Sequence, residues 1–147
     1  MNAKAPIEVG QSADVTAVVQ RSDTAQVLST SPEDTFPEVF ATSRMIALME
    51  LAAARVMRPL LRAGQLSVGV TVNVKHTAAT PVGGEVRAVA TYLGEEGKLF
   101  RFKVEAFDEA GSIGEGEHLR AIIATERLLA GAAKRKAARR SWKGEGS

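Results

Sequence analysis

Apolar residues recur with helical spacing between positions 45 and 60. The pattern consists of Met45, Ile46, Leu48, Met49, Ala52, Ala53, Val56, Met57 and Leu60. These residues cover more than half of the helix circumference, and arginines supply the remaining polar side. A helix with so wide an apolar surface should be wrapped by the rest of the chain. Pro59 and Gly64 indicate where the helix ends.

The start of this helix is marked by residues typical of helix caps. Thr35 and Glu38 have the spacing of a capping box, with Pro37 inside the first turn. The sequence therefore predicts a helical turn beginning near Thr35. Thr42 or Ser43 could cap the second, longer segment.

A second pattern, strict alternation, covers residues 67–76. Valines at 68, 70, 72 and 74 alternate with polar residues and glycine, which predicts a strand with one apolar face. His76 has the same parity as the valines. We therefore expect His76 to point toward the core, where the helix must lie.

Further strands are expected at residues 8–20, 85–93, 98–108 and 112–126, with turns at 95–97 and 108–111. Residues 21–35 read as a long loop, often a lid or binding loop in a small domain, and residues 127–140 as a helix. The order is one strand, a loop, the long helix and four antiparallel strands joined by short turns. This order predicts an α+β hotdog fold, in which a curled five-stranded antiparallel sheet wraps one central helix.

Charge divides the chain into a body and a tail. Residues 134–147 hold six basic residues and one acidic residue, whereas residues 1–133 hold 13 basic and 16 acidic residues. We therefore expect one domain over residues 1–133, followed by a flexible, basic and solvated tail over residues 134–147. The tail contains one aromatic residue, Trp142, and no recognised binding fold surrounds it, so no nucleic-acid partner is expected. The sequence shows neither a membrane-spanning run nor a signal-peptide core, which favours a cytoplasmic location.

Glu50 is the only acidic residue between positions 39 and 84, and it sits within the apolar helix. An unpaired buried charge is costly, so a partner is expected. His76 is one candidate, and Thr42 lies two helical turns before Glu50 on the same broad face. A carboxylate, an imidazole and a hydroxyl can build a hydrolytic site, in which either the carboxylate or the hydroxyl attacks the acyl group. On spacing alone, Glu50 could equally pair with an arginine while His76 is a satisfied core histidine.

Other kinds of site find little support in the sequence. The chain lacks a Gly-x-Ser-x-Gly elbow and a Walker loop. With two histidines and no cysteine, neither a metal site nor another cofactor is expected. His118 follows a glycine-rich stretch with acidic neighbours, and we assign it a structural or surface role.

Four motifs resemble one known family. The stretches FPEVFAT, LME, KHTAATP and IGEGEHLRAII, in this order, are similar to the fluoroacetyl-CoA thioesterase type of hotdog protein over about residues 8–130. The resemblance implies an acyl-CoA thioesterase that acts as a homodimer, with active sites at the subunit interface. It also assigns roles: catalytic Thr42, Glu50 and His76, and substrate-binding Phe36, Gly69 and Arg120.

The chain departs from that family at one lid position. Three residues before Phe36, where the fluoroacetyl-specific pattern has a second aromatic, this chain has Glu33. An acidic residue cannot make the same dry cover, so fluoroacetyl specificity does not follow from the resemblance. We expect hydrolysis of a short-chain acyl-CoA. A non-hydrolytic acyl-CoA or small-ligand binding module is the alternative, and a hotdog hydratase, which needs a different Asp/His arrangement, ranks third.

Overall fold

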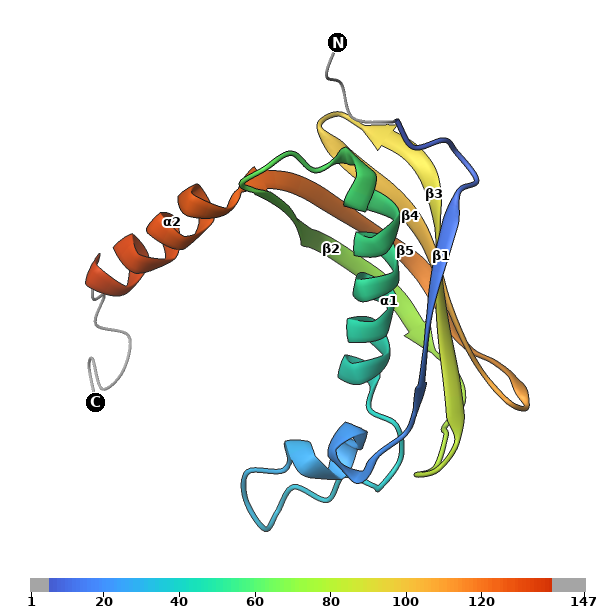
Figure 1. Ribbon diagram of the computed structural model, residues 1–147. Coiled ribbons are helices and arrows are strands. Elements are labelled where there is room, and N and C mark those ends of the chain that lie inside the picture. Colours follow the sequence, from blue (N-terminus) through green and yellow to red (C-terminus); the bar gives the residue numbers. More distant parts are fainter. Residues whose placement is uncertain (1–5, 139–147) are drawn as a thin grey trace.

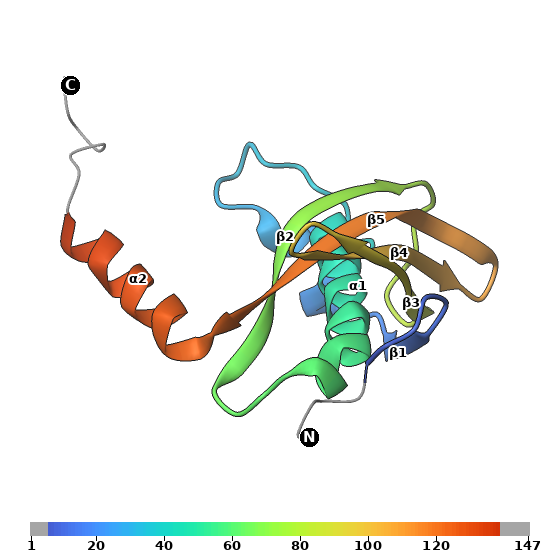
Figure 2. The same cartoon turned by 90° about the horizontal axis from the view of Figure 1, so that it is seen from above.

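The computed structural model describes residues 6–138, which form one curled antiparallel sheet around one helix (Figure 1, Figure 2). The strands are β1 (Ser12–Val18), β2 (Gln65–His76), β3 (Glu85–Glu96), β4 (Leu99–Asp108) and β5 (Gly111–Ala124). They are ordered β1-β3-β4-β5-β2, so β1 and β2 form the two edges. The predicted α+β architecture with five strands and a central helix is therefore confirmed.

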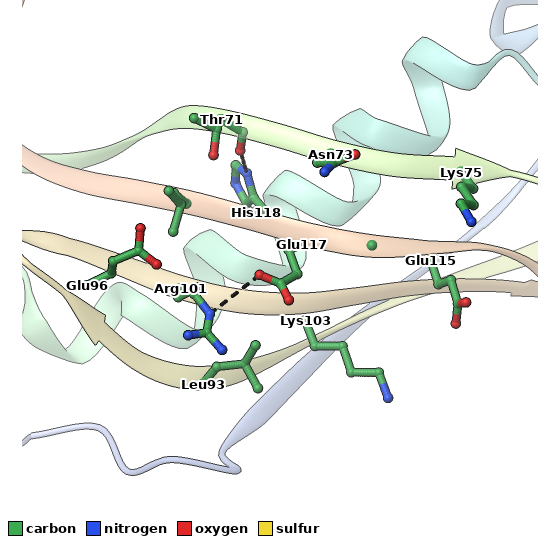
Figure 3. A pocket seen from close by; sticks show the side chains of 12 residues that line it. Thr71, Asn73, Lys75, Leu93, Glu96, Arg101, Lys103, Glu115, Glu117 and His118 are labelled. Carbon is green, nitrogen blue, oxygen red and sulfur yellow. Dashed lines mark hydrogen bonds and ion pairs between the residues drawn. The ribbon is translucent and has the colours of Figure 1, made fainter.

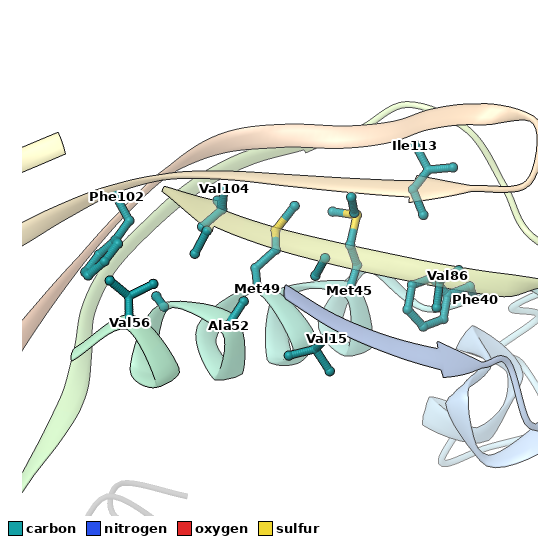
Figure 4. Close-up of a cluster of buried hydrophobic side chains, with 14 of the residues drawn as sticks. Val15, Phe40, Met45, Met49, Ala52, Val56, Val86, Phe102, Val104 and Ile113 are labelled. Atoms are coloured by element: carbon teal, nitrogen blue, oxygen red, sulfur yellow. The ribbon is translucent and has the colours of Figure 1, made fainter. Parts of the chain in front are cut away.

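The central helix α1 (Thr42–Met57) lies in the hollow of the sheet and supplies much of the core. Met45, Met49, Ala52, Val56 and Met57 are almost completely buried, as the helical spacing predicted. Figure 4 shows Met45, Met49 and Val56 of α1 on the side of the helix that faces the sheet, where Phe102, Val104 and Ile113 lie. Burying a side chain of this size contributes on the order of 1.5–3 kcal/mol, so the shared core fixes α1 against the sheet.

The connection between β2 and β3 differs from the expectation of successive neighbouring strands. β2 pairs with β5 and not with β3, while β3 lies between β1 and β4. Residues 77–84 therefore carry the chain from one edge of the sheet toward the other. As a result, β2 has β5 on one side and no strand on its other side within the described residues.

The segment between β1 and α1 contains two short 3-10 helices, η1 (Arg21–Asp23) and η2 (Ala25–Leu28). The predicted helical turn at Thr35 is absent, and Glu38 forms an ion pair with Arg21 at 2.8 Å and no capping box. Isolated β-bridges join Thr24 to Phe40 and Val39 to Pro81. They fasten this segment beside the N-terminal end of α1.

The end of α1 and the C-terminal helix lie close to their predicted positions. α1 is followed by a 3-10 turn, η3 (Arg58–Leu60), and Gly64 has a φ of +82°, a conformation that glycine adopts readily. The C-terminal helix α2 (Thr125–Ala138) leads away from the sheet, and none of its residues is buried. The predicted tail boundary at residue 133 falls inside α2, and residues 139–147 lie outside the described part. Within residues 6–138, no helix is long and apolar enough to span a bilayer.

Candidate functional site

The first pair of predicted site residues meets where α1 begins and β2 ends. Thr42 is the first residue of α1, and His76 is the last residue of β2. Thr42 Oγ1 lies 2.8 Å from His76 Nδ1, so the hydroxyl bonds to the imidazole and makes no helix cap. The ring of Phe40 meets the imidazole edge-on, with centroids 6.4 Å apart. A hydroxyl is thus held within proton-transfer distance of a histidine.

Burial sets the protonation state of His76. Its partial removal from water lowers the pKa of the imidazole below the usual value of 6.5, against a smaller opposite effect from the backbone of Ala78. The neutral ring can accept the hydroxyl proton at Nδ1 while its other nitrogen, Nε2, carries hydrogen. His76 is therefore ready to act as a base at neutral pH.

A second cluster surrounds Glu50, farther along α1. Its carboxylate oxygen Oε1 accepts a bond from Arg120 Nη1 at 3.3 Å. Arg120 is only 5% exposed, and Ser67 accepts two more of its N–H groups, at Oγ (3.0 Å) and at the backbone oxygen (2.8 Å). Arg120 Nη1 also lies 3.1 Å from Nε2 of the buried His118. The guanidinium is therefore fixed on several sides, while the Glu50 side chain remains 40% exposed.

Gly69 lets this cluster close up against β2. A Cβ atom at this position would lie 2.5 Å from Glu50 Oε1 and 3.1 Å from His118 Cε1. The first distance is shorter than real contacts allow, so the absence of a side chain permits the carboxylate to approach the strand.

A β-bulge changes which side chains of β2 face the helix. The register with β5 shifts between Gly69 and Thr71. Gly69 pairs with Arg120 and Thr71 pairs with Leu119, so β2 has one extra residue at this point. Ser67 and Gly69, which the alternation placed on the outer face, touch Arg120 and Glu50 on the inner face. Beyond the bulge, His76 lies on the inner side of the sheet, as predicted. The prediction that all four valines of this strand point inward is wrong, because the bulge changes the face on which alternate residues lie.

Within one chain the two clusters are separate. Thr42 and Glu50 are eight residues apart, about 12 Å along the helix axis. No hydrogen bond or ion pair joins Glu50 to His76 in the part of the chain that the structure describes. The hypothesis of a facing Glu50–His76 pair is therefore wrong for a single chain, and Glu50 instead has the arginine partner that the sequence left open.

Sequence reasoning missed two members of the second cluster, Ser67 and His118. His118 is 1% exposed, which excludes the surface alternative and leaves the predicted structural role, but its contact with Arg120 was not foreseen. It lies two residues before Arg120 on the same strand, and alternate residues of a strand share a face. That spacing is a signal the sequence already contained.

The lid residues lie in the segment before α1. Phe36 is 48% exposed, and its contact with substrate stays a prediction. Glu33 is exposed and accepts a bond from Ser31 Oγ at 2.7 Å, which lowers the pKa of its carboxyl. The segment predicted to form a lid thus carries a charged side chain at position 33.

A hollow of about 680 Å³ lies elsewhere, on the outer face of the sheet (Figure 3). In Figure 3, α1 lies behind the sheet, and the hollow is lined by acidic and basic side chains such as Glu117 and Arg101. Neither Thr42 nor Glu50 lines it. Among residues 6–138, no group of three or more potential metal ligands comes together.

Comparisons with known proteins identify relatives that match most of the chain. A family model described as fluoroacetyl-CoA-specific thioesterase matches residues 12–126. The fluoroacetyl-CoA thioesterase of Streptantibioticus cattleyicolor is 45% identical over 95 residues, which cover 65% of this chain and 68% of that protein. These matches confirm the family resemblance that the four motifs predicted.

Solved structures agree with the sequence matches. A structure of the fluoroacetyl-CoA thioesterase FlK has a TM-score of 0.83 and 39% identity, and the match covers 88% of this chain and 98% of that one. A variant of FlK in complex with fluoroacetate and CoA has a TM-score of 0.78 and 40% identity, covering 83% and 99%. A hypothetical Thermus thermophilus protein, described as a thioesterase superfamily member, has a TM-score of 0.80 and 30% identity, covering 90% and 96%.

Proposed function

The chain belongs to the family of fluoroacetyl-CoA-specific thioesterases, and from this premise we propose that it hydrolyses a short-chain acyl-CoA to free acid and CoA. The observation that carries the proposal is the 2.8 Å bond between Thr42 Oγ1 and His76 Nδ1. It places a hydroxyl beside a base whose pKa is lowered by burial. This is the pairing that activates a weak oxygen nucleophile.

In the proposed reaction, Thr42 Oγ1 attacks the thioester carbonyl carbon while His76 takes its proton. The carbon–sulfur bond then breaks, and the proton passes from His76 to the departing CoA sulfur. Water attacks the resulting acyl-threonine ester with His76 again as base, which releases the acid and restores the hydroxyl. Mass spectrometry of acid-quenched enzyme tests this step: an acyl group on Glu50 instead of Thr42 would assign the attack to the carboxylate.

Glu50 is proposed as the third catalytic residue, with Gly69 and Arg120 beside it as site residues. Arg120 donates to the carboxylate at 3.3 Å, and Gly69 leaves it room. The buried arginine uses its N–H groups on protein acceptors, so we propose that it acts on substrate chiefly through Glu50. Phe36, half exposed in the segment before α1, is proposed to cover the acyl group.

We further propose that the chain works as a homodimer whose active sites combine residues of two subunits. Edge strand β2 has twelve residues, and Val70 and Val72 are 49% and 39% exposed on it. So long an unpaired edge invites a second strand. Glu50 and His76 both lie beside β2 yet do not meet within one chain, so pairing of two β2 edges would place a second copy next to both.

Mixing two inactive variants tests the composite site. Subunits carrying Glu50→Gln are exchanged with subunits carrying His76→Ala at equal concentration. If each site takes Glu50 from one subunit and His76 from the other, half of the dimers are mixed and each contains one intact site. About a quarter of wild-type activity should then return. No recovery, with subunit exchange verified by mass spectrometry, would place all catalytic groups of a site in one chain.

The acyl group is proposed to be small, and the charged lid residue Glu33 argues against strict fluoroacetyl specificity. The experiment is CoA release, followed with a thiol reagent, across acetyl-, propionyl-, butyryl- and fluoroacetyl-CoA. Continuous release supports hydrolysis, whereas tight binding of every thioester without release would make the chain a binding module. A cytoplasmic location, where acyl-CoA is available, is part of the same proposal.

A further inference from the structure

His118 lies inside the sheet and has a polar partner at each ring nitrogen. Its side chain belongs to β5 and is 1% exposed. Nδ1 lies 2.8 Å from the backbone oxygen of Thr71 on β2, the contact drawn as a dashed line in Figure 3. Nε2 lies 3.1 Å from Arg120 Nη1. The imidazole therefore bridges the bulged strand and the arginine that holds Glu50.

These two partners determine where the proton of His118 resides. A backbone oxygen can only accept, so Nδ1 must carry hydrogen and donate to Thr71. A guanidinium nitrogen can only donate, so Nε2 must be bare and accept from Arg120. A second proton would place N–H against N–H beside a cation, and burial further lowers the pKa of this imidazole. His118 is thus a neutral acceptor aimed at Arg120.

The same guanidinium nitrogen serves His118 and Glu50. Nη1 has two hydrogens, and its two acceptors are His118 Nε2 and Glu50 Oε1. The other side of the group is held by Ser67, through Nε and Nη2. The imidazole thus accepts one of the two Nη1 hydrogens, and the bond to Glu50, at 3.3 Å, is the longest of the four.

We propose that His118 is a positioning residue for thioester hydrolysis: it orients Nη1 of Arg120 so that the guanidinium holds the Glu50 carboxylate beside Gly69. The inference rests on the proposed catalytic role of Glu50. A purely structural role would also require the buried ring nitrogens to be hydrogen-bonded, so turnover is the property that distinguishes positioning from packing.

Two single variants separate positioning from packing. His118→Gln carries an amide oxygen near the place of Nε2, so it can still accept from Arg120 while it loses the bond to Thr71. His118→Asn is shorter, so it can still donate to Thr71 while it offers Arg120 no acceptor. Each variant loses one buried hydrogen bond, and their melting temperatures should therefore fall by similar amounts.

The two variants should differ in turnover. We expect His118→Asn to lower kcat about 10- to 100-fold with KM little changed, the factor that corresponds to one hydrogen bond to a charged group. His118→Gln should stay within about threefold of wild type. Val104→Ala, which truncates a fully buried core valine outside this network, controls for loss of stability alone. Equal kcat values for the Gln and Asn variants would overturn the proposal.

One measurement on the unmodified protein is independent of these variants. Long-range ¹H–¹⁵N NMR of the wild type should show His118 neutral, with hydrogen on Nδ1 and a bare Nε2. A proton on Nε2 at neutral pH would overturn the positioning role whatever the turnover of the variants. A wild-type chain with the expected tautomer but without CoA release would instead refute the proposed function.

Discussion

Gly69→Ala should separate activity from stability more sharply than any other single change in this chain. The new Cβ would lie 2.5 Å from Glu50 Oε1, against 3.4 Å or more for an ordinary contact. The carboxylate must therefore move by about 0.9 Å, which disturbs its bond to Arg120, already 3.3 Å long. A misplacement of about 1 Å in a catalytic group can cost on the order of 100-fold in rate.

The effect on stability should be small. A hydrogen bond to a charged group contributes about 1.5–3 kcal/mol, but the Glu50 side chain is 40% exposed, so water replaces much of the lost bond. Replacing glycine by alanine also returns about 0.4–1 kcal/mol through the unfolded chain. We therefore expect the melting temperature to change by no more than about 4 °C while kcat falls about 10- to 100-fold.

The assay is CoA release beside a calorimetric melting curve, with Gly131→Ala as the matched control. Gly131 lies on α2, and nothing would meet a Cβ atom there within 4 Å. The control should keep normal turnover. Wild-type kcat in folded Gly69→Ala would refute the reasoning, because the placement of Glu50 would then not matter for the reaction.

Three further predictions follow from the same structure. Glu50→Gln, which is nearly isosteric, should lower kcat strongly with the melting curve intact; near-normal turnover would make Glu50 purely structural. The pKa values of His76 and His118 lie below 6.5 because of burial, so the unfolded chain binds protons near pH 6 that the folded chain does not. The melting temperature should fall as pH decreases from 7 to 5, whereas a flat profile would contradict the neutral imidazoles. Truncation after Ala133 should leave kcat unchanged, since no residue of α2 is buried; loss of turnover in a folded truncation would contradict this.

Helices and strands could be predicted from the sequence because each is marked by a pattern of apolar residues within its own segment. The apolar spacing of α1 and the alternation of the strands gave elements whose ends lie within a few residues of those observed. The long segment before α1 was likewise visible as a polar stretch, although the two short 3-10 helices within it were not predicted.

Features that depend on residues far apart in the chain could not be predicted from the sequence. The bulge between Gly69 and Thr71 arises from pairing with β5, so alternation within β2 alone assigned Gly69 to the wrong face. The predicted capping box at Thr35 is absent, and the carboxylate of Glu38 instead accepts a bond from Arg21, seventeen residues earlier. The hydroxyl of Thr42 bonds to His76 across the fold, in preference to capping its own helix.

The structure brings most of the predicted site residues together in two groups, and their catalytic and binding roles stay predictions. The predicted Thr42 and His76 lie in contact, and Glu50, Gly69 and Arg120 form a second cluster. The roughly 12 Å between Thr42 and Glu50 follows from helix geometry, but the sequence did not show that the two residues belong to separate clusters. Only the fold shows that β2, running beside α1, connects both clusters along one edge of the sheet.

The most direct test of the proposed thioesterase site is steady-state CoA release by the wild type and by His76→Ala, measured on protein shown by its melting curve to be folded. The wild type should release CoA continuously from a short acyl-CoA, and the variant should be about 10² to 10⁴ times slower, the usual contribution of a general base. Equal turnover of the two proteins would contradict the assignment of the Thr42–His76 pair as the catalytic centre.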